Sequence, residues 1–316
     1  MKKPIISVVV TTYNHEKYIA QTIESILSQK DCPDFEIIVG EDCSTDKTRE
    51  IVKVYADKYP QIKLMNYDTN QGVQKNLKEC FNYCQGEYIA ICEGDDYWVD
   101  KYKLKKQYEV LDRNKEASMC FSDITLLFED GSTAGHFSGI RKTLPEIITV
   151  KEVLLHKGSP ATFSCCMYTA QAVASVPHSY YEIGDAYDLL FNLYVLEQGV
   201  AIFLKEACVY YRITSQGLWN RKSEQEKRND TVAVLASYNK FFNYKHDEYF
   251  NAAILLTLGI SQATTGTEDE GETIICIEND DDDETKKVHF RELMALELPF
   301  PGKRILKISI QGRRKH

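Results

Sequence analysis

The sequence predicts an α/β protein with a mostly parallel central sheet flanked by helices. Continuous apolar, β-branched runs occur at residues 5–12 (IISVVVTT), 35–40 (FEIIVG) and 87–92 (EYIAIC). Such runs are typical of strands that are buried on both faces. Between them stand stretches whose apolar residues recur at helical spacing. Repeated strand–helix units with short loops favour a parallel sheet covered by helices.

The other elements follow in order along the chain. Residues 16–29 form the first expected helix, with an apolar stripe of Ile19, Ile23, Ile26 and Leu27. Residues 72–84 place Val73, Leu77, Cys80, Phe81 and Cys84 on one helical face. The remaining expected elements are helices over 46–59, 101–114 and 185–198, and strands over 62–66, 117–128, 163–169 and 200–212.

The chain divides by composition into three parts. Residues 1–220 carry the α/β pattern, and residues 221–266 are expected to form a helical extension. Residues 267–316 are interpreted as an acidic linker followed by a basic tail. The linker holds ten acidic residues and no base over 267–284, so we expect it to be disordered or solvated.

Bulk composition limits the function and the location. No run of about 18 apolar residues is present, and the N-terminus lacks the pattern of a signal peptide. The ten cysteines include no Cys-x-x-Cys pair, which favours buried, reduced thiols in a cytoplasmic protein. No basic stripe interleaved with aromatic residues suggests nucleic-acid binding.

Polar and acidic residues follow three of the predicted strands. They are Thr11–Asn14, Glu41–Asp46 and Glu93–Trp98. Ligands of parallel sheets bind beyond the carboxyl ends of the strands, where two carboxylate clusters would repel each other unless a cation neutralised them. Carboxylate oxygens are ligands that Mg²⁺ or Mn²⁺ prefers, so a metal–diphosphate site is predicted. For each cluster alone, helix caps and solvated turns remain an alternative.

The same segments carry a family resemblance. ISVVVTTYNHEKYIAQTIESILSQ, FEIIVGEDCSTDKT, the turn Asn70-Gln71-Gly72 and GEYIAICEGDDYW cover most of the first 110 residues. Together they resemble the family-2 inverting glycosyltransferases of the GT-A fold. The resemblance implies a Rossmann-like GT-A domain, a nucleotide-sugar donor and Mn²⁺ or Mg²⁺ as cofactor.

The resemblance also implies roles for individual residues. Thr11 and Tyr13 would line the nucleobase pocket, and Asp42 would hydrogen-bond the base. Asp95 matches the metal-binding acid of the family. Glu93 departs from the family at the first position of the motif, so it is only a possible site residue. Asp96 is an extra acid, assigned to donor binding or to the orientation of Trp98.

Two further segments complete the implied site. Asp185 precedes a helix pattern and is the implied catalytic base, with Asp188 and Glu182 as weaker candidates. Arg212 would reach a phosphate of the donor. Thr214 stands where many relatives have histidine, and this departure keeps open the alternative of an inactive module that binds a nucleotide, a glycan or a protein.

The predicted reaction is transfer of one or a few sugars, with inversion, to an acceptor hydroxyl of a surface polysaccharide or glycolipid. Uridine diphosphate sugars are the expected donors by analogy. A dehydrogenase or a nucleotidyltransferase needs a glycine-rich loop after the first strand, and residues 13–18 contain no glycine. Two interpretations of the basic tail, residues 286–316, stay open: peripheral contact with the inner face of the membrane, or an unstructured tail that only pairs with the acidic segment.

Overall fold

The structure is a computed structural model that describes residues 3–135, 145–155, 161–183, 188–214 and 222–258, together with three short strands at 263–267, 273–279 and 307–312. The described residues belong to two compact units, Met1–Asn220 and Arg221–His316. Each unit is considered by itself below.

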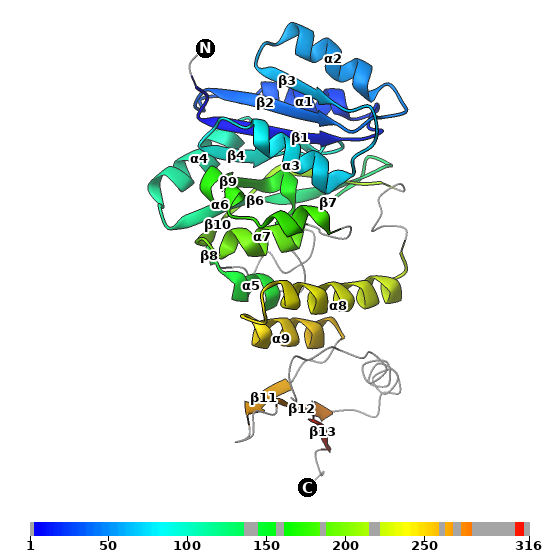
Figure 1. Cartoon of the computed structure of the whole chain (residues 1–316), viewed down its shortest axis with the longest axis vertical. Helices are drawn as coiled ribbons and strands as arrows, with labels where there is room; N and C mark the ends of the chain where they lie inside the picture. The colour runs from blue at the N-terminus through cyan, green and yellow to red at the C-terminus, as the bar shows by residue number, and fades with distance from the viewer. Residues whose placement is uncertain are drawn as a thin grey trace. The chain divides into compact units, whose positions relative to one another are not determined.

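The first half of unit 1 alternates strands and helices (Figure 1). Its strands pair in parallel in the order β3-β2-β1-β4. The residues of β1 are buried along its whole length, as the β-branched pattern predicts. The elements are β1 (Ile6–Thr12), α1 (Ile19–Leu27), β2 (Phe35–Glu41), α2 (Thr48–Lys58), β3 (Ile62–Asn66), α3 (Val73–Tyr83) and β4 (Tyr88–Ile91).

The second half of unit 1 extends the same sheet with mixed pairing. From β4 the order continues β9-β6-β10-β5, with β7 on β6 and β8 on β10. Only β6 and β10 are parallel to each other here, while β9, β5, β7 and β8 pair antiparallel. The strands are β5 (Tyr97–Trp98), β6 (Ala117–Phe128), β7 (Thr133–Gly135), β8 (Ile147–Ile148), β9 (Cys166–Thr169) and β10 (Val200–Ile213).

Helices and short turns cover this half of the sheet. They are α4 (Lys103–Arg113), α5 (Val150–Leu155), η2 (Phe163–Cys165), α6 (Ala170–Ala174), η3 (His178–Glu182) and α7 (Asp188–Leu196). The α/β class with a central sheet flanked by helices is therefore confirmed, although the sheet is more mixed than the strand–helix repeat indicates.

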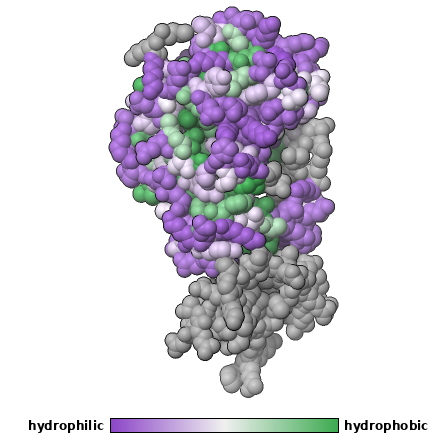
Figure 2. All heavy atoms as spheres, in the orientation of Figure 1, coloured by the Kyte–Doolittle hydropathy of each residue, from purple (hydrophilic) through white to green (hydrophobic). Residues whose placement is uncertain are grey.

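The hydropathy of the surface is consistent with the burial of the apolar strands. On the face shown in Figure 2 the described residues are mainly hydrophilic, with smaller hydrophobic areas between them. Within the described part of the chain, no helix combines the length and the apolar character needed to cross a membrane.

Unit 2 begins with two helices. They are α8 (Glu224–Phe241), which starts with a capping box formed by Ser223 and Glu226, and α9 (Asp247–Thr257). Asn243 and Tyr244 between them have φ values of 49° and 61°. This left-handed backbone ends the first helix, because consecutive left-handed residues cannot continue a right-handed one.

Three strands follow in unit 2. β11 (Ala263–Thr267) pairs antiparallel with β12 (Thr273–Asn279), which pairs in parallel with β13 (Lys307–Gly312). β12 lies inside the acidic segment 267–284, where the β-branched run Thr273–Ile277 interrupts the acidic residues and favours a strand. That most of this segment is disordered or solvated stays a prediction.

Candidate active site

The carboxyl ends of β1, β2 and β4 meet at one edge of the sheet. The main-chain N–H of Asp42, just after β2, donates to the carbonyl oxygen of Thr12 at 3.0 Å. The N–H of Gly94, after β4, donates to the carbonyl oxygen of Thr11 at 2.9 Å. The three polar segments identified in the sequence therefore lie side by side, as parallel pairing requires.

After β4 the chain makes a tight reversal, Glu93-Gly94-Asp95-Asp96, which we call the acid turn. The N–H of Asp96 donates to the carbonyl oxygen of Glu93 at 3.0 Å and closes it. The hydroxyl of Thr22, on α1, donates to the carbonyl oxygen of Asp96 at 2.6 Å. A Cβ atom at Gly94 would lie 2.6 Å from Thr12 Oγ1, so only glycine lets the turn approach the end of β1 this closely.

The acid turn carries more negative charge than the protein around it balances. Asp96 is 2% exposed, and burial, followed by the charge of Asp95, raises the pKa of its carboxyl group well above the usual range. Burial and the charges of Asp96 and Asp95 also raise the pKa of Glu93. Among the residues that the structure describes, none makes a hydrogen bond or ion pair with the carboxylate of Asp95, and Asp96 Oδ2 is buried without a partner.

Arg212, on β10, is the cation nearest to this turn in the described contacts. Its main-chain N–H donates to Asp96 Oδ1 at 2.9 Å. Its guanidinium carbon lies 4.7 Å from the ring centroid of Tyr18 and 5.0 Å from that of Tyr97. The two ring faces stabilise the cation, and a hydrogen bond to Gln21 holds its outer end. The short pairing of β5 with β10 brings Arg212 to this place.

The acidic cluster after β2 differs from the acid turn because protein groups already satisfy it. Glu41 is fully buried, pairs with Arg49 at 2.5 Å and accepts from the N–H of Ser44 at 2.7 Å. Asp42 Oδ1 and Oδ2 accept from the N–H groups of Gln71 and Gly72 at 2.6 and 2.9 Å. The argument that both clusters need a cation is therefore wrong for this cluster. Its carboxylates instead accept hydrogen bonds or pair with a cation within the protein, as in the alternative of a local turn.

The donor atoms of the acid turn fit a hard divalent cation. They are carboxylate oxygens, and two of the carboxyl groups have unpartnered oxygens in the described structure. No group of three histidine, cysteine, aspartate or glutamate side chains in the described ranges is arranged to hold a metal by itself. In Mg²⁺-type sites, one or two carboxylates bind the ion, and substrate phosphates and water complete its shell.

The residues assigned to the nucleobase lie along the same edge. Thr11 is buried at the end of β1, whereas Tyr13 just beyond it is 41% exposed. The next residue, Asn14, has a φ of 56°, and its side-chain oxygen accepts from the N–H of Thr45 at 2.8 Å. Asn14 thus ties the loop after β1 to the loop after β2. At this edge Tyr13 is exposed, whereas Asp42 is buried.

Of the two aspartates proposed as base, the structure describes one. Asp185 lies in residues 184–187, outside the described ranges. Asp188 is the first residue of α7, and its charge contributes to the raised pKa of Glu93 after burial and the charges of Asp96 and Asp95. Glu182, the weaker candidate on η3, instead pairs with His178 at 3.1 Å.

Sequence reasoning missed two residues of the site. Ser164, in η2, accepts from the N–H of Glu93 through its hydroxyl oxygen at 3.0 Å. Tyr211, on β10, has a pKa raised well above its usual value by burial and then by the charges of Glu93 and Asp96. Strand alternation places neighbouring residues such as Tyr211 and Arg212 on opposite faces of β10, so the sequence pattern that pointed to Arg212 did not point to Tyr211. Nothing in the sequence links Ser164 to residue 93.

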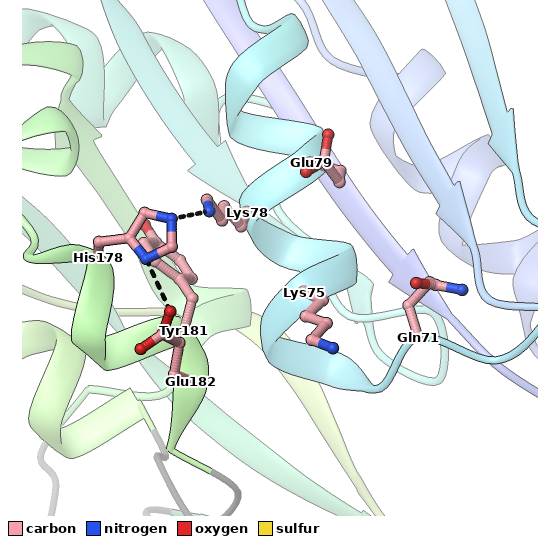
Figure 3. A pocket seen from close by; sticks show the side chains of 7 residues that line it. All are labelled: Gln71, Lys75, Lys78, Glu79, His178, Tyr181 and Glu182. Atoms are coloured by element: carbon pink, nitrogen blue, oxygen red, sulfur yellow. Dashed lines mark hydrogen bonds and ion pairs between the residues drawn. The ribbon is translucent and has the colours of Figure 1, made fainter.

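A separate cavity of about 190 Å³ lies between α3 and η3 (Figure 3). Lys78 Nζ lies 2.5 Å from His178 Nε2, and His178 Nδ1 lies 3.1 Å from Glu182 Oε1. Lysine and glutamate side chains both line the cavity, so it has no excess charge of one sign. The lining residues are Gln71, Lys75, Lys78, Glu79, His178, Tyr181 and Glu182.

An α/β sheet with an acidic turn at the carboxyl edge of its parallel strands is the architecture of a nucleotide-binding transferase fold. Residues 7–173 match the family model for glycosyl transferase family 2, and the chain belongs to this family. The resemblance seen in the N-terminal motifs is therefore confirmed.

Curated relatives support the assignment over different lengths. The putative teichuronic acid biosynthesis glycosyltransferase TuaG of Bacillus subtilis is 27% identical over 227 residues, which cover 72% of this chain and 86% of TuaG. Relatives from Mycobacterium tuberculosis without an assigned function are 40% identical over 132 residues. The matched part spans only 38% of the length of these mycobacterial proteins and 42% of this chain.

Solved structures share the fold. Staphylococcus aureus TarS 1–349 in complex with UDP-GlcNAc matches with a TM-score of 0.57 and 23% identity over 73% of this chain and 65% of that one. The mannosyltransferase PcManGT of Pyrobaculum calidifontis, in complex with GDP-Man and Mn²⁺, matches with a TM-score of 0.57 and 14% identity, covering 81% of this chain and 70% of that one.

Proposed function

We propose that this protein is a metal-dependent, inverting glycosyltransferase that transfers a hexosyl or N-acetylhexosaminyl group from a nucleotide diphosphate, most simply a UDP-sugar, to an acceptor hydroxyl. The acid turn carries the proposal, because its unpartnered carboxylates lie at the ligand-binding edge of a family-2 fold. The UDP-GlcNAc in the TarS structure supports a nucleotide-sugar donor, and the GDP-Man and Mn²⁺ in the PcManGT structure support a divalent cation.

The donor would lie along the edge formed by the ends of β1, β2 and β4. Thr11, Tyr13 and Asp42 would bind the nucleobase, and Asp42 retains lone pairs for it beyond the two main-chain bonds that it already accepts. Asp95, with Glu93 as a possible second ligand, would hold Mn²⁺ or Mg²⁺. The bound cation would neutralise the charge that develops on the departing nucleotide diphosphate.

The other groups would act directly on the substrates. Arg212, held by Tyr18 and Tyr97, would bind a donor phosphate. Asp96 would fix Arg212 through its main-chain bond and orient the donor sugar. Asp185 would take the proton of the acceptor hydroxyl while the acceptor oxygen attacks the anomeric carbon and the bond to the diphosphate breaks. Asp188 is the second candidate for this base.

The acceptor is proposed by analogy with relatives. TuaG is named for teichuronic acid biosynthesis, and TarS is a poly(ribitol-phosphate) β-N-acetylglucosaminyltransferase. Both names point to cell-surface polymers, so we propose a surface polysaccharide or a glycolipid as the acceptor. We also propose a cytoplasmic location, which the nine unpaired cysteines among the described side chains support.

A binding screen tests this function. Purified protein is heated with UDP, GDP, UDP-GlcNAc, UDP-glucose or GDP-mannose, each with Mn²⁺ or with EDTA. We expect uridine nucleotides to raise the melting temperature more with Mn²⁺ than with EDTA. Slow hydrolysis of the stabilising donor would then separate an enzyme from an inactive binding module. Absence of stabilisation by every nucleotide would refute the proposed function.

A further inference from the structure

Beneath the acid turn lies a lysine that the proposed reaction does not use. Lys103, in the first turn of α4, is 0% exposed. Its Nζ atom donates to Gln107 Oε1 at 2.7 Å and lies 4.2 Å from the ring centroid of Trp98. A buried cation is costly, and an apolar side chain of similar size would fill the same space without that cost. Packing alone therefore does not explain why a lysine occupies this buried position.

Within the part of the chain that the structure describes, no residue forms an ion pair with Lys103. Its pKa is lowered by burial. The neighbouring thiols of Cys92, Cys166 and Cys208 have pKa values raised by their own burial, so they are neutral at physiological pH. The groups that favour its charged form are the Trp98 ring face and the Gln107 carbonyl oxygen. Lys103 thus depends on these two side chains being held in place.

These side chains belong to a closed set of contacts. The indole Nε1 of Trp98 donates to the carbonyl oxygen of Ser164 at 2.9 Å. The amide Nε2 of Gln107 donates to the carbonyl oxygen of the next residue, Cys165, at 2.8 Å. Lys103 joins Gln107 to Trp98 and closes the set, which we call the buried ring. All of its side chains are at most 3% exposed.

The buried ring contacts the start of the acid turn, and its member Trp98 lies two residues after the end of the turn. At the start of the turn, the Ser164 hydroxyl oxygen accepts from the N–H of Glu93 at 3.0 Å. After its end, the N–H of Trp98 donates to Ser25 Oγ on α1 at 3.1 Å. The positions of the two ends of the turn therefore depend on Trp98 and on residues 164–165, which Lys103 and Gln107 hold together.

We propose that Lys103 is a positioning residue, which through Trp98 and Ser164 holds the acid turn in the conformation that binds a divalent cation together with a nucleotide diphosphate. This inference rests on the proposed function. It assigns to Lys103 no contact with either ligand. The cost of burying the lysine is offset by the contacts that it completes within the ring.

A double-mutant cycle tests the proposal with UDP and Mn²⁺ as probes. The variants are Lys103→Met, Ser164→Ala and the double variant, and Lys101→Met at an exposed position just before α4 is the matched control. We expect Lys103→Met to weaken UDP binding about tenfold in Mn²⁺ and to leave UDP binding in EDTA unchanged. The double variant should be no weaker than the weaker single variant, whereas Lys101→Met should equal wild type.

Three results would overturn the proposal. They are purely additive effects of Lys103→Met and Ser164→Ala, equal losses with and without Mn²⁺, and unchanged binding in Lys103→Met. Because Lys103→Met alters a buried site, Gln107→Met provides a second way to open the ring and should give the same metal-dependent loss. If the wild-type protein binds no UDP, the proposed function is wrong. If the wild-type protein binds UDP but the effects of the two substitutions are additive, only the role of Lys103 is overturned.

The ring can also be followed without any ligand. The chain has two tryptophans, so Trp219→Phe leaves Trp98 as the only one. In that background Lys103→Met should shift the Trp98 emission maximum and its near-ultraviolet circular dichroism, and Lys101→Met should not. An unchanged Trp98 spectrum in Lys103→Met, with a normal melting temperature, would show that Lys103 does not hold the ring.

Discussion

The main-chain N–H of Arg212 donates to Oδ1 of Asp96 at 2.9 Å, across 116 positions of sequence. This bond fixes the last strand of the sheet to the acid turn. It places a guanidinium group, held by Tyr18 and Tyr97, beside carboxylates whose charge the described protein does not balance. A cation and an anion can therefore be bound next to each other, which is what a metal–diphosphate complex requires.

The role of Asp95 in metal binding is the first prediction. Asp95→Ala removes an unpartnered carboxylate, so it should abolish both sugar transfer and the Mn²⁺-dependent part of UDP affinity. Its effect on folding should be small, because the side chain makes no hydrogen bond with a described residue. Isothermal titration of UDP in Mn²⁺ and in EDTA measures this, with Asp57→Ala on the exposed face of α2 as control. Full Mn²⁺ dependence in Asp95→Ala would rule out the assignment.

Asp42 is predicted to act on the nucleotide and on the turn Asn70-Gln71-Gly72. Asp42→Ala frees two main-chain N–H groups, and a hydrogen bond to a charged group contributes about 1.5–3 kcal/mol, so the free energy of unfolding should fall by a few kcal/mol. UDP affinity in EDTA should fall as well. Urea unfolding and metal-free titration measure the two effects. Undiminished affinity for UDP would show that Asp42 holds only the turn.

The choice of base is tested by two matched substitutions. Asp185→Asn and Asp188→Asn keep the size of each side chain, but an amide cannot accept a proton at neutral pH. We expect Asp185→Asn to bind UDP with wild-type affinity and to lose transfer at least a hundredfold, the lower end of general base effects. Asp188→Asn should retain most of the turnover. The opposite ranking of the two rates would move the base to Asp188, at the start of α7.

The raised pKa of Asp96 predicts a pH-dependent stability. A carboxyl group whose pKa is higher in the folded than in the unfolded state favours folding below the unfolded pKa, and this contribution is lost as the pH rises through the folded pKa. In EDTA at neutral pH, Asp96→Asn should therefore be more stable than wild type, by about 1–3 kcal/mol. The difference should vanish in acid. Thermal melts from pH 4 to pH 8 measure it, and a constant difference would contradict the burial of an ionised Asp96.

Membrane contact of the basic tail, residues 286–316, is the last prediction. Each basic residue near an anionic membrane surface contributes about 1 kcal/mol. At low salt the full chain should float with vesicles of phosphatidylglycerol and phosphatidylcholine, whereas a chain ending at Pro299 should remain at the bottom. The same flotation by both chains would exclude a membrane role for the segment after Pro299. High salt is the control, because it screens charge without removing apolar contacts.

Much of the first 110 residues was predictable from sequence. Buried parallel strands are easy to recognise in a sequence, because both faces of β1 and β2 must be apolar. The helices between them have one apolar face and one polar face. The carboxyl ends of parallel strands share one edge of a sheet, so the meeting of Thr12, Asp42 and Gly94 followed from topology alone. The strand expected over 163–169 includes β9, but its antiparallel pairing and the two-residue β5 were not predictable in the same way, because short strands carry little pattern.

The sequence by itself determined the fold class, the family motifs and the place of the acid turn, because these depend on local composition and on the order of strands. Only the tertiary structure decided which carboxylates are already satisfied. Glu41 and Asp42 looked like Asp95 and Asp96 in sequence, yet Arg49 and two main-chain amides neutralise the first pair. Likewise, only packing brought Lys103 and Ser164 beneath the acid turn. Hydrogen bonds and burial between distant segments depend on the folded chain, so no local pattern records them.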